Sequence, residues 1–263
     1  MMPDCGLRTI SFMGMNLLVG TSSTVADWMA GKTPPDSTTV AHINFYSYWI
    51  ATRREPAADY EHYALVFEGI GMKLAAWILG HGWLPDANGT DMYPMVMEHA
   101  TRRKLRVFLL GGTPSVLEAT IRRVRLTYPQ VRLCGARSGY FADSEVPEII
   151  ERIRSSAPDL LLISRGSSLH ADFISRCRKA LHVGLIWNTG GLFDFVSGRV
   201  PRAPKWMRKV RIEWLFRLLI EPFRKGHRIF VVAPWFLTQA VRALWIRDSS
   251  ASNKESVQLE IEK

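Results

Sequence analysis

Short apolar runs alternate with longer segments of helical periodicity along most of this 263-residue chain. Six runs have the apolar character of buried strands, at residues 39–43, 63–67, 106–110, 131–134, 160–164 and 183–187. Continuous apolar strands that alternate with helices are typical of a parallel sheet covered on both faces. The pattern therefore predicts an α/β, Rossmann-like fold, with a mostly parallel sheet and helices on both faces.

Capping residues mark the starts of two helices. Thr113 followed by Pro114 combines an N-cap side chain with a proline at the first helical position, and predicts a helix to about residue 126. A Tyr-Pro pair directly after this segment ends the helix. Asp91 or Thr90 is expected to cap a second helix, which runs to about residue 103.

The composition is that of a globular protein with one sizeable core, since 47% of the residues are hydrophobic. No internal repeat and no interior linker is visible, so residues 1–198 are predicted to form one α/β domain. Residues 199–247 are predicted to form a basic, aromatic and helical C-terminal appendage. The Ser-rich residues 248–263 are predicted to be a disordered tail.

The cysteines predict neither a disulfide framework nor a zinc site. Cys5, Cys134 and Cys177 are odd in number, widely spaced and without nearby histidines. The sequence contains no run of 18 uninterrupted apolar residues, and its start lacks the features of a signal peptide. We therefore expect a protein of the cytoplasm, with no metal site.

Positive charge is concentrated in the appendage. Residues 199–228 contain ten Lys or Arg and two Asp or Glu, which accounts for +8 of the formal net charge of +10. Trp206, Val210, Trp214 and Leu218 form a stripe at helical spacing, and other apolar residues fall on the opposite side. One face is expected to pack on the domain and the other to lie on an anionic membrane surface. The alternative is a packed helix with a solvated basic rim; no nucleic-acid-binding motif accompanies the patch.

Glycines follow several of the predicted strands. The pair Gly111–Gly112, Gly166 and the pair Gly190–Gly191 fall at carboxyl ends of strands, where ligands of such sheets bind. The strand, glycine turn and helix start around the first pair favour a phosphate. That turn matches neither G-x-G-x-x-G nor the Walker pattern, which disfavours an ordinary dehydrogenase and a P-loop NTPase. A phosphate-bearing ligand is predicted, with packing as the alternative for the first pair and an ordinary turn for the second.

The segment from Asn188 to Arg208, with its continuation from Arg211 to Arg224, closely resembles the end of the WecG/TagA/CpsF family of bacterial glycosyltransferases. Further matches follow in the family's order, at Asn44 and at residues 65–71, 89–91 and 107–112. The resemblance extends from about residue 40 to about residue 237 and so covers most of the chain.

The resemblance implies an inverting, metal-independent transferase that moves a sugar from a UDP-sugar to a polyprenyl-diphosphate-linked saccharide, in exopolysaccharide or cell-surface polysaccharide synthesis. Residues 1–198 would be the nucleotide-sugar-binding catalytic domain of a protein held peripherally at the cytoplasmic face of the inner membrane. The UDP-sugar is a substrate, and no cofactor is implied. No D-x-D pair occurs among the eleven aspartates, so the metal-clamping motif of one large class of glycosyltransferases is missing. Exposed tryptophans leave self-association open.

Such a transfer needs a base for the acceptor hydroxyl and positive groups for the departing diphosphate. Glu68 occupies the position of the family's aspartate base, and an acid in the N-cap region of the next helix is its alternative role. The residues expected to contact the donor or substrate are His42, Asn44, Asp91, Gly111, Gly112, Gly166, His170, Gly190, Gly191 and Asp194. Those expected to contact the diphosphate or the membrane are Arg199, Arg202, Arg208, Arg211 and Arg217.

Several positions depart from the family pattern. His42 stands where threonine is usual, and His170 and Ala171 replace a glutamine and a glutamate. His170 can still donate and accept a hydrogen bond, whereas Ala171 removes a charge. Glu68 is one methylene longer than the usual aspartate. The alternative function is therefore a weakened or silent relative that holds a nucleotide sugar or acts as a scaffold.

Overall fold

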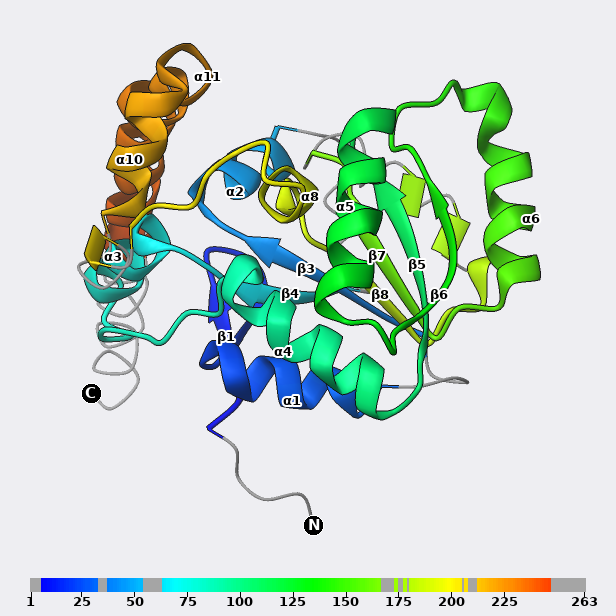
Figure 1. Cartoon of the computed structure of the whole chain (residues 1–263). Coiled ribbons are helices and arrows are strands. Elements are labelled where there is room, and N and C mark those ends of the chain that lie inside the picture. The colour runs from blue at the N-terminus through cyan, green and yellow to red at the C-terminus, as the bar shows by residue number, and fades with distance from the viewer. Residues whose placement is uncertain are drawn as a thin grey trace, which may run out of the picture.

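The computed structural model describes residues 6–32, 37–53, 63–166, 173–174, 177–178, 180–204, 206–207 and 212–246. The strands within these ranges are β1 (Arg8–Phe12), β2 (Met15–Val19), β3 (Thr38–Ile43), β4 (Tyr63–Phe67), β5 (Arg106–Gly111), β6 (Arg132–Arg137), β7 (Leu160–Ser164) and β8 (Leu185–Asn188). They form one eight-stranded sheet in the order β1-β2-β4-β3-β8-β7-β5-β6 (Figure 1).

Helices connect the strands and cover the sheet (Figure 1). They are α1 (Ser22–Ala30), α2 (Phe45–Ala51), α3 (Ile70–Ile78), α4 (Gly89–Arg102), α5 (Pro114–Thr127), α6 (Val146–Ser156), α8 (Leu192–Val196), α10 (Glu213–Ile220) and α11 (Pro222–His227), with a 3-10 turn η2 (Asp143–Glu145) and a π-helical turn η3 (Arg228–Val232).

The six expected strands are all present and pair in parallel, which confirms the α/β class. Bounds differ where pairing with a neighbour decides the length: β6 continues to Arg137 because that residue still pairs with Leu110 of β5. The hairpin of β1 and β2 was not expected. It is antiparallel and turns at Met13 and Gly14, which both have positive φ, and β2 then pairs in parallel with β4.

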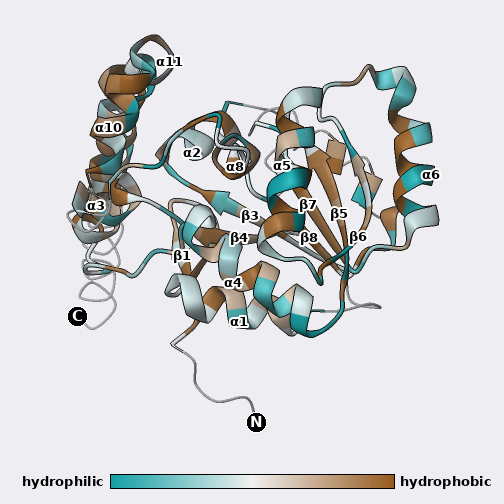
Figure 2. Ribbon diagram, viewed as in Figure 1, coloured by the Kyte–Doolittle hydropathy of each residue, from teal (hydrophilic) through white to brown (hydrophobic). Residues whose placement is uncertain are grey.

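Side chains of the central strands alternate between two cores, because successive residues of a strand point to opposite faces. Val40 and Val66 belong to the core beneath α1, α4, α5 and α8. Ile43 and Phe67 belong to the core beneath α2, α3 and α6. Figure 2 shows the central strands β5, β7 and β8 as mostly hydrophobic, as expected for a sheet that is covered twice.

The predicted caps are right for one helix and wrong for the other. Thr113 caps α5 by accepting a hydrogen bond from the backbone N–H of Val116, with proline at the first helical position, as predicted. In α4, neither Thr90 nor Asp91 is the cap: the side chain of Asn88 accepts from the Thr90 N–H at 2.9 Å. Asp91 lies inside the first turn, where its charge complements the helix dipole.

The C-terminal part is a stack of helices at one end of the sheet (Figure 1). Ile212 is the N-cap residue of α10, with a φ of −101° and a ψ of 23°, so the stripe expected from Trp206 to Leu218 does not lie on one continuous helix. Its member Val210 falls outside the described residues, as does the predicted tail 248–263.

A longer helix, Arg228–Ile246, begins with η3 and is called the C-terminal helix below. By length and composition it is apolar enough to cross a membrane. One side of it carries Phe236 and Ala240, which are fully buried in the same core as α2 and α3. Its other side exposes Phe230 and Trp245. The helix therefore has two apolar sides, one packed on the domain and one facing outward.

Candidate active site

A cavity of about 420 Å³ opens at the carboxyl ends of β3, β4, β5, β7 and β8. This is the edge at which open parallel sheets bind their ligands, and the volume suits a small-molecule site. The cavity brings together ten of the predicted site residues, namely His42, Asn44, Glu68, Gly112, Gly166, Gly190, Gly191, Asp194, Arg199 and Arg217.

Three predicted residues lie outside the cavity lining. The Cβ of an alanine at Gly111 would stand 2.3 Å from the carbonyl oxygen of Ser164, so this glycine allows β5 and β7 to approach each other. Asp91 and Arg202 form an ion pair, with 2.8 Å between Oδ1 and Nη2, that ties the chain after α8 to α4. His170, Arg208 and Arg211 lie outside the described residues, as does the departure at Ala171.

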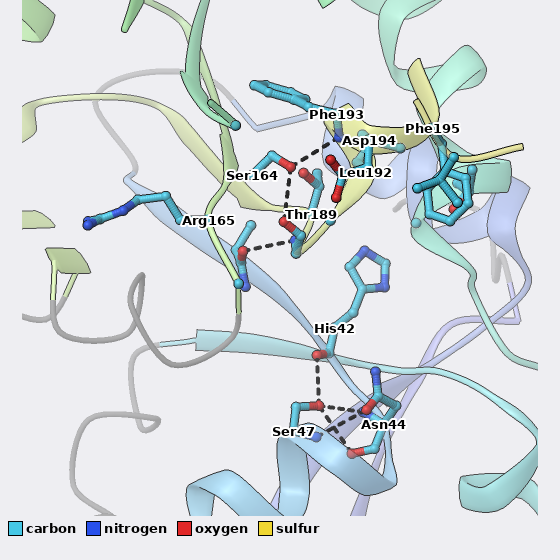
Figure 3. Close-up of a pocket in the computed structure, with 18 of the residues that line it drawn as sticks. His42, Asn44, Ser47, Ser164, Arg165, Thr189, Leu192, Phe193, Asp194 and Phe195 are labelled. Atoms are coloured by element: carbon cyan, nitrogen blue, oxygen red, sulfur yellow. Dashed lines mark hydrogen bonds between the residues drawn. The ribbon is translucent and has the colours of Figure 1, made fainter. Parts of the chain in front are cut away.

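The turn after β8 is held open toward the cavity. Gly190 has a φ of 60°, and a Cβ built on it would meet nothing within 4 Å. The hydroxyl of Ser164 donates to the Gly190 carbonyl at 2.9 Å and accepts from the Phe193 N–H at 3.1 Å (Figure 3). The glycine is thus required by its backbone conformation rather than by packing, and the space beside it is free for a ligand.

Asn44 serves as a cap as well as a cavity wall. Its Oδ1 accepts from the backbone N–H groups of Tyr46 and Ser47, and the Ser47 hydroxyl accepts in return from the Asn44 N–H (Figure 3). This capping box fixes the start of α2 directly above the end of β3. The structure thus shows Asn44 as a helix cap, and its contact with the donor stays a prediction.

Glu68 follows β4 and points into the site. Its side chain is 19% exposed, and its Oε2 lies 3.6 Å from Nδ1 of His42. Burial raises the pKa of Glu68 to about 7, while the charge of Arg217 and a hydrogen bond from the Gly89 backbone act in the opposite direction. Glu68 also directly precedes Gly69, the N-cap residue of α3, so it stands in the N-cap region as the alternative role has it, although no side chain caps that helix. A carboxyl that titrates near neutral pH is suited to accept a proton.

His42 is almost enclosed, with a side chain that is 8% exposed. Its Nε2 accepts a hydrogen bond from the indole Nε1–H of Trp187 at 3.0 Å, and its Nδ1 lies 3.1 Å from the carbonyl oxygen of Ala87. Burial lowers the pKa of His42 to about 4, against the opposing effect of the hydrogen bond to Ala87. The ring is therefore neutral at physiological pH.

Arg217 reaches the site from α10. Its Nη2 donates to Oε1 of Glu213 at 2.8 Å, and its guanidinium lies 4.5 Å from the centre of the Phe195 ring. The Nη1 atom of Arg199 lies 3.6 Å from Oδ1 of Asp194, so a second cation lies at the rim of the cavity. The C-terminal helices thus contribute positive charge to a cavity that is otherwise built from the sheet.

Sequence reasoning missed several lining residues. Arg228 lies over the ring of Tyr46 at 3.7 Å, and Arg165 directly follows β7. Arg228 belongs to the basic segment 199–228 but is not among the residues predicted to contact the diphosphate. Arg165 had a visible signal, because it precedes Gly166 at the end of a predicted strand. Among the described residues, no group of three or more His, Cys, Asp or Glu is placed to hold a metal ion.

Comparison with known proteins gives one family and two relatives. The model of the glycosyl transferase WecG/TagA/CpsF family matches residues 10–250. An N-acetylglucosaminyldiphosphoundecaprenol N-acetyl-beta-D-mannosaminyltransferase of Bacillus spizizenii is 31% identical over 157 residues, and the protein of the same name from Bacillus subtilis is 29% identical over 161 residues. Each match covers 60% of this chain and 60% of the relative. Since the family model covers most of the chain, from β1 through the C-terminal helix, this protein belongs to the WecG/TagA/CpsF family of glycosyl transferases.

Proposed function

We propose that this protein is an inverting glycosyltransferase that moves a sugar from a UDP-sugar to a polyprenyl-diphosphate-linked saccharide. The observation that carries the proposal is Glu68, a largely enclosed carboxyl with a pKa near 7 that lines a cavity with Arg217 at its rim. The relatives' names support the acceptor class, because they specify transfer to N-acetylglucosaminyldiphosphoundecaprenol.

The chemistry follows from these groups. The acceptor hydroxyl gives its proton to the Glu68 carboxylate while its oxygen forms a bond to the anomeric carbon of the donor. The bond from that carbon to the diphosphate oxygen breaks, and its electron pair leaves with UDP. Attack from the face opposite the leaving group inverts the anomeric configuration. The products are the glycoside, UDP and a protonated Glu68, which then releases its proton to solvent.

The departing diphosphate needs positive groups near the glycine turns. Arg217 and Arg199 lie on the rim of the cavity, and the open space beside Gly190 lets a ligand approach the backbone closely. Guanidinium groups stabilise developing negative charge at a phosphate oxygen by charge-assisted hydrogen bonds. We propose that they do so without a metal ion.

A transfer assay tests the proposal. Membranes that carry polyprenyl-diphosphate sugars are incubated with labelled UDP-glucose, UDP-N-acetylmannosamine or its uronic acid, with and without EDTA. Label is expected to enter organic-extractable material from one donor, at the same rate in EDTA. If no donor transfers label while the Bacillus subtilis relative does so, the silent alternative replaces this proposal. A rate abolished by EDTA and restored by a divalent cation would refute metal independence alone.

We further propose that the outward side of the C-terminal helices rests on the anionic inner surface of the membrane. Phe223 of α11 is 98% exposed and Phe230 is 70% exposed, and Trp245 is exposed along the same chain segment. Aromatic side chains beside basic ones favour an anionic interface. Such contact would bring the cavity close to a lipid-linked acceptor.

Vesicle binding is expected to depend on these two phenylalanines. Burial of a phenylalanine side chain in lipid contributes about 1.5–3 kcal/mol, so the Phe223→Ser/Phe230→Ser double variant should bind anionic vesicles at least about tenfold more weakly. Sedimentation with vesicles that contain phosphatidylglycerol measures this. Leu126→Ser on α5, which also removes an exposed apolar side chain, is the matched control and should bind like the wild type. Equal binding of the double variant would contradict the proposal.

A further inference from the structure

The tautomer of His42 is determined by its neighbour in the core. An indole N–H can only donate, so the Nε2 atom that receives the Trp187 hydrogen bond at 3.0 Å must carry a lone pair. The ring proton of the neutral histidine is then on Nδ1. That N–H faces the Ala87 carbonyl oxygen at 3.1 Å and Oε2 of Glu68 at 3.6 Å. Nδ1–H therefore donates to the Ala87 carbonyl, and the carboxylate of the candidate base lies beside it, in electrostatic contact but beyond hydrogen-bond length.

The surroundings hold this arrangement rigidly. Trp187 is fully buried in the core beneath α1 and α4, so its N–H direction is set by packing. On the other side, a Cβ built on Gly89 would stand 3.3 Å from Nε2 of His42, so a larger residue at position 89 would crowd the ring. The histidine ring is thus held by hydrogen bonds at both nitrogens, to Trp187 of β8 and to the Ala87 carbonyl.

A second proton on His42 is unfavourable for the same reasons. Its Nε2 lone pair is already used, and burial lowers the pKa of the ring to about 4. A cationic imidazolium 3.6 Å from Glu68 would stabilise the carboxylate and weaken it as a base. The neutral ring instead presents its N–H dipole to the carboxylate and adds no net charge, so the carboxylate remains basic.

We propose that His42 is a positioning residue for Glu68: Trp187 holds it in the Nδ1–H tautomer, and the positive end of its N–H dipole, 3.6 Å from Oε2, orients the carboxylate toward the acceptor without neutralising it. This inference rests on the proposed function of Glu68 as the base, and it replaces donor contact as the role of His42. Four other polar or charged groups act on Glu68, namely Arg217 and Glu213 of α10, Asp86, and the backbone N–H of Gly89.

Paired substitutions at His42 test the role by kinetics. Asparagine places an N–H group at the same number of bonds from the backbone as Nδ1, whereas leucine fills the site without a donor. His42→Leu is expected to lower kcat about 100-fold, as expected for a base displaced by about 1 Å, with the KM for the donor changed less than threefold. His42→Asn should recover at least tenfold of that loss. Equal kcat values for the two variants, or a rise in KM with kcat unchanged, would overturn the proposal.

Nuclear magnetic resonance gives a readout that needs no turnover. In protein labelled with ¹⁵N-histidine, the signals that disappear in His42→Asn identify His42. These signals should remain those of the neutral Nδ1–H tautomer from about pH 5 to about pH 8. In Trp187→Phe, the ring should lose that tautomer preference and bind a proton at higher pH. The Nε2–H tautomer in the wild type, or an unchanged spectrum in Trp187→Phe, would overturn the proposal.

The carboxyl of Glu68 can be followed in the same way. Its ¹³C signal is expected to titrate at higher pH in His42→Leu than in the wild type, and to return toward the wild-type midpoint in His42→Asn, because a donor to the carboxylate lowers its pKa. An unmoved midpoint would show that His42 only fills space. If these titrations behave as expected while no sugar is transferred, the proposed function fails and the coupling of His42 to Glu68 stands.

Discussion

Replacing Glu68 by glutamine is expected to lower kcat by about 10²–10⁴, the contribution that a positioned general base usually makes. The same variant should be more stable than the wild type at alkaline pH. Burial raises the pKa of Glu68 from an ordinary 4.5 to about 7, so folding makes ionisation of this carboxyl unfavourable. Glutamine has nearly the same shape and never ionises.

The pH window of the stability change follows from these two pKa values. Below pH 4.5 the carboxyl is protonated in both folded and unfolded chains, and the two proteins should have similar stability. Between pH 4.5 and about 7 the carboxyl is ionised in the unfolded chain but still largely protonated in the folded chain, so the free energy of unfolding of the wild type falls. Above pH 8 the wild type should be less stable than the variant by up to about 3 kcal/mol.

Urea unfolding at pH 5 and pH 9 (roughly either side of the folded pKa), together with the transfer assay, measures both effects. Glu118→Gln is the matched control, because it removes an exposed carboxylate of α5 that forms an ion pair with Arg122 one helical turn away. It should change neither turnover nor the pH dependence of stability. Full turnover of Glu68→Gln would remove Glu68 from the role of base, whatever its effect on stability.

Replacing Arg217 by alanine is the second change with a large expected effect. Loss of one group that stabilises a developing anion commonly costs about 10²–10³ in rate. Arg217 also lowers the pKa of Glu68. Without this cation, the pKa of the base should rise above 7, and the acid limb of the kcat/KM profile should move to higher pH. Part of the lost rate should therefore be recovered at alkaline pH.

Two further variants separate the effects of charge and geometry. Arg217→Lys keeps the positive charge but not the planar fork, and should restore the position of the acid limb more fully than the rate. Glu213→Gln keeps Arg217 and removes the acidic partner that raises the pKa of Glu68, so its acid limb should move to lower pH. An acid limb that is the same in Arg217→Ala and the wild type would show that Arg217 does not act on the base.

Local patterns were sufficient for six strands of the sheet, from β3 to β8, and for one cap. The apolar runs at β4 and β7 predicted those strands to the residue, and Thr113 with Pro114 predicted the start of α5. The β1–β2 hairpin escaped prediction because Met13 with Gly14 is not among the common turn pairs for positive φ. The cap of α4 was misplaced because Asn88, Thr90 and Asp91 are all good capping residues, and only the chain path into the helix selects among them.

The site shows where sequence and tertiary structure divide. By itself the sequence determined six of the strands, which glycines and carboxylates stand at strand ends, and the family to which the chain belongs, because these depend on local patterns and on resemblance. Only the tertiary structure decided that His42, Glu68, Trp187 and Arg217 meet, since they come from four elements far apart in the chain. Their charge states follow from burial and from neighbours across the fold, which no local pattern contains.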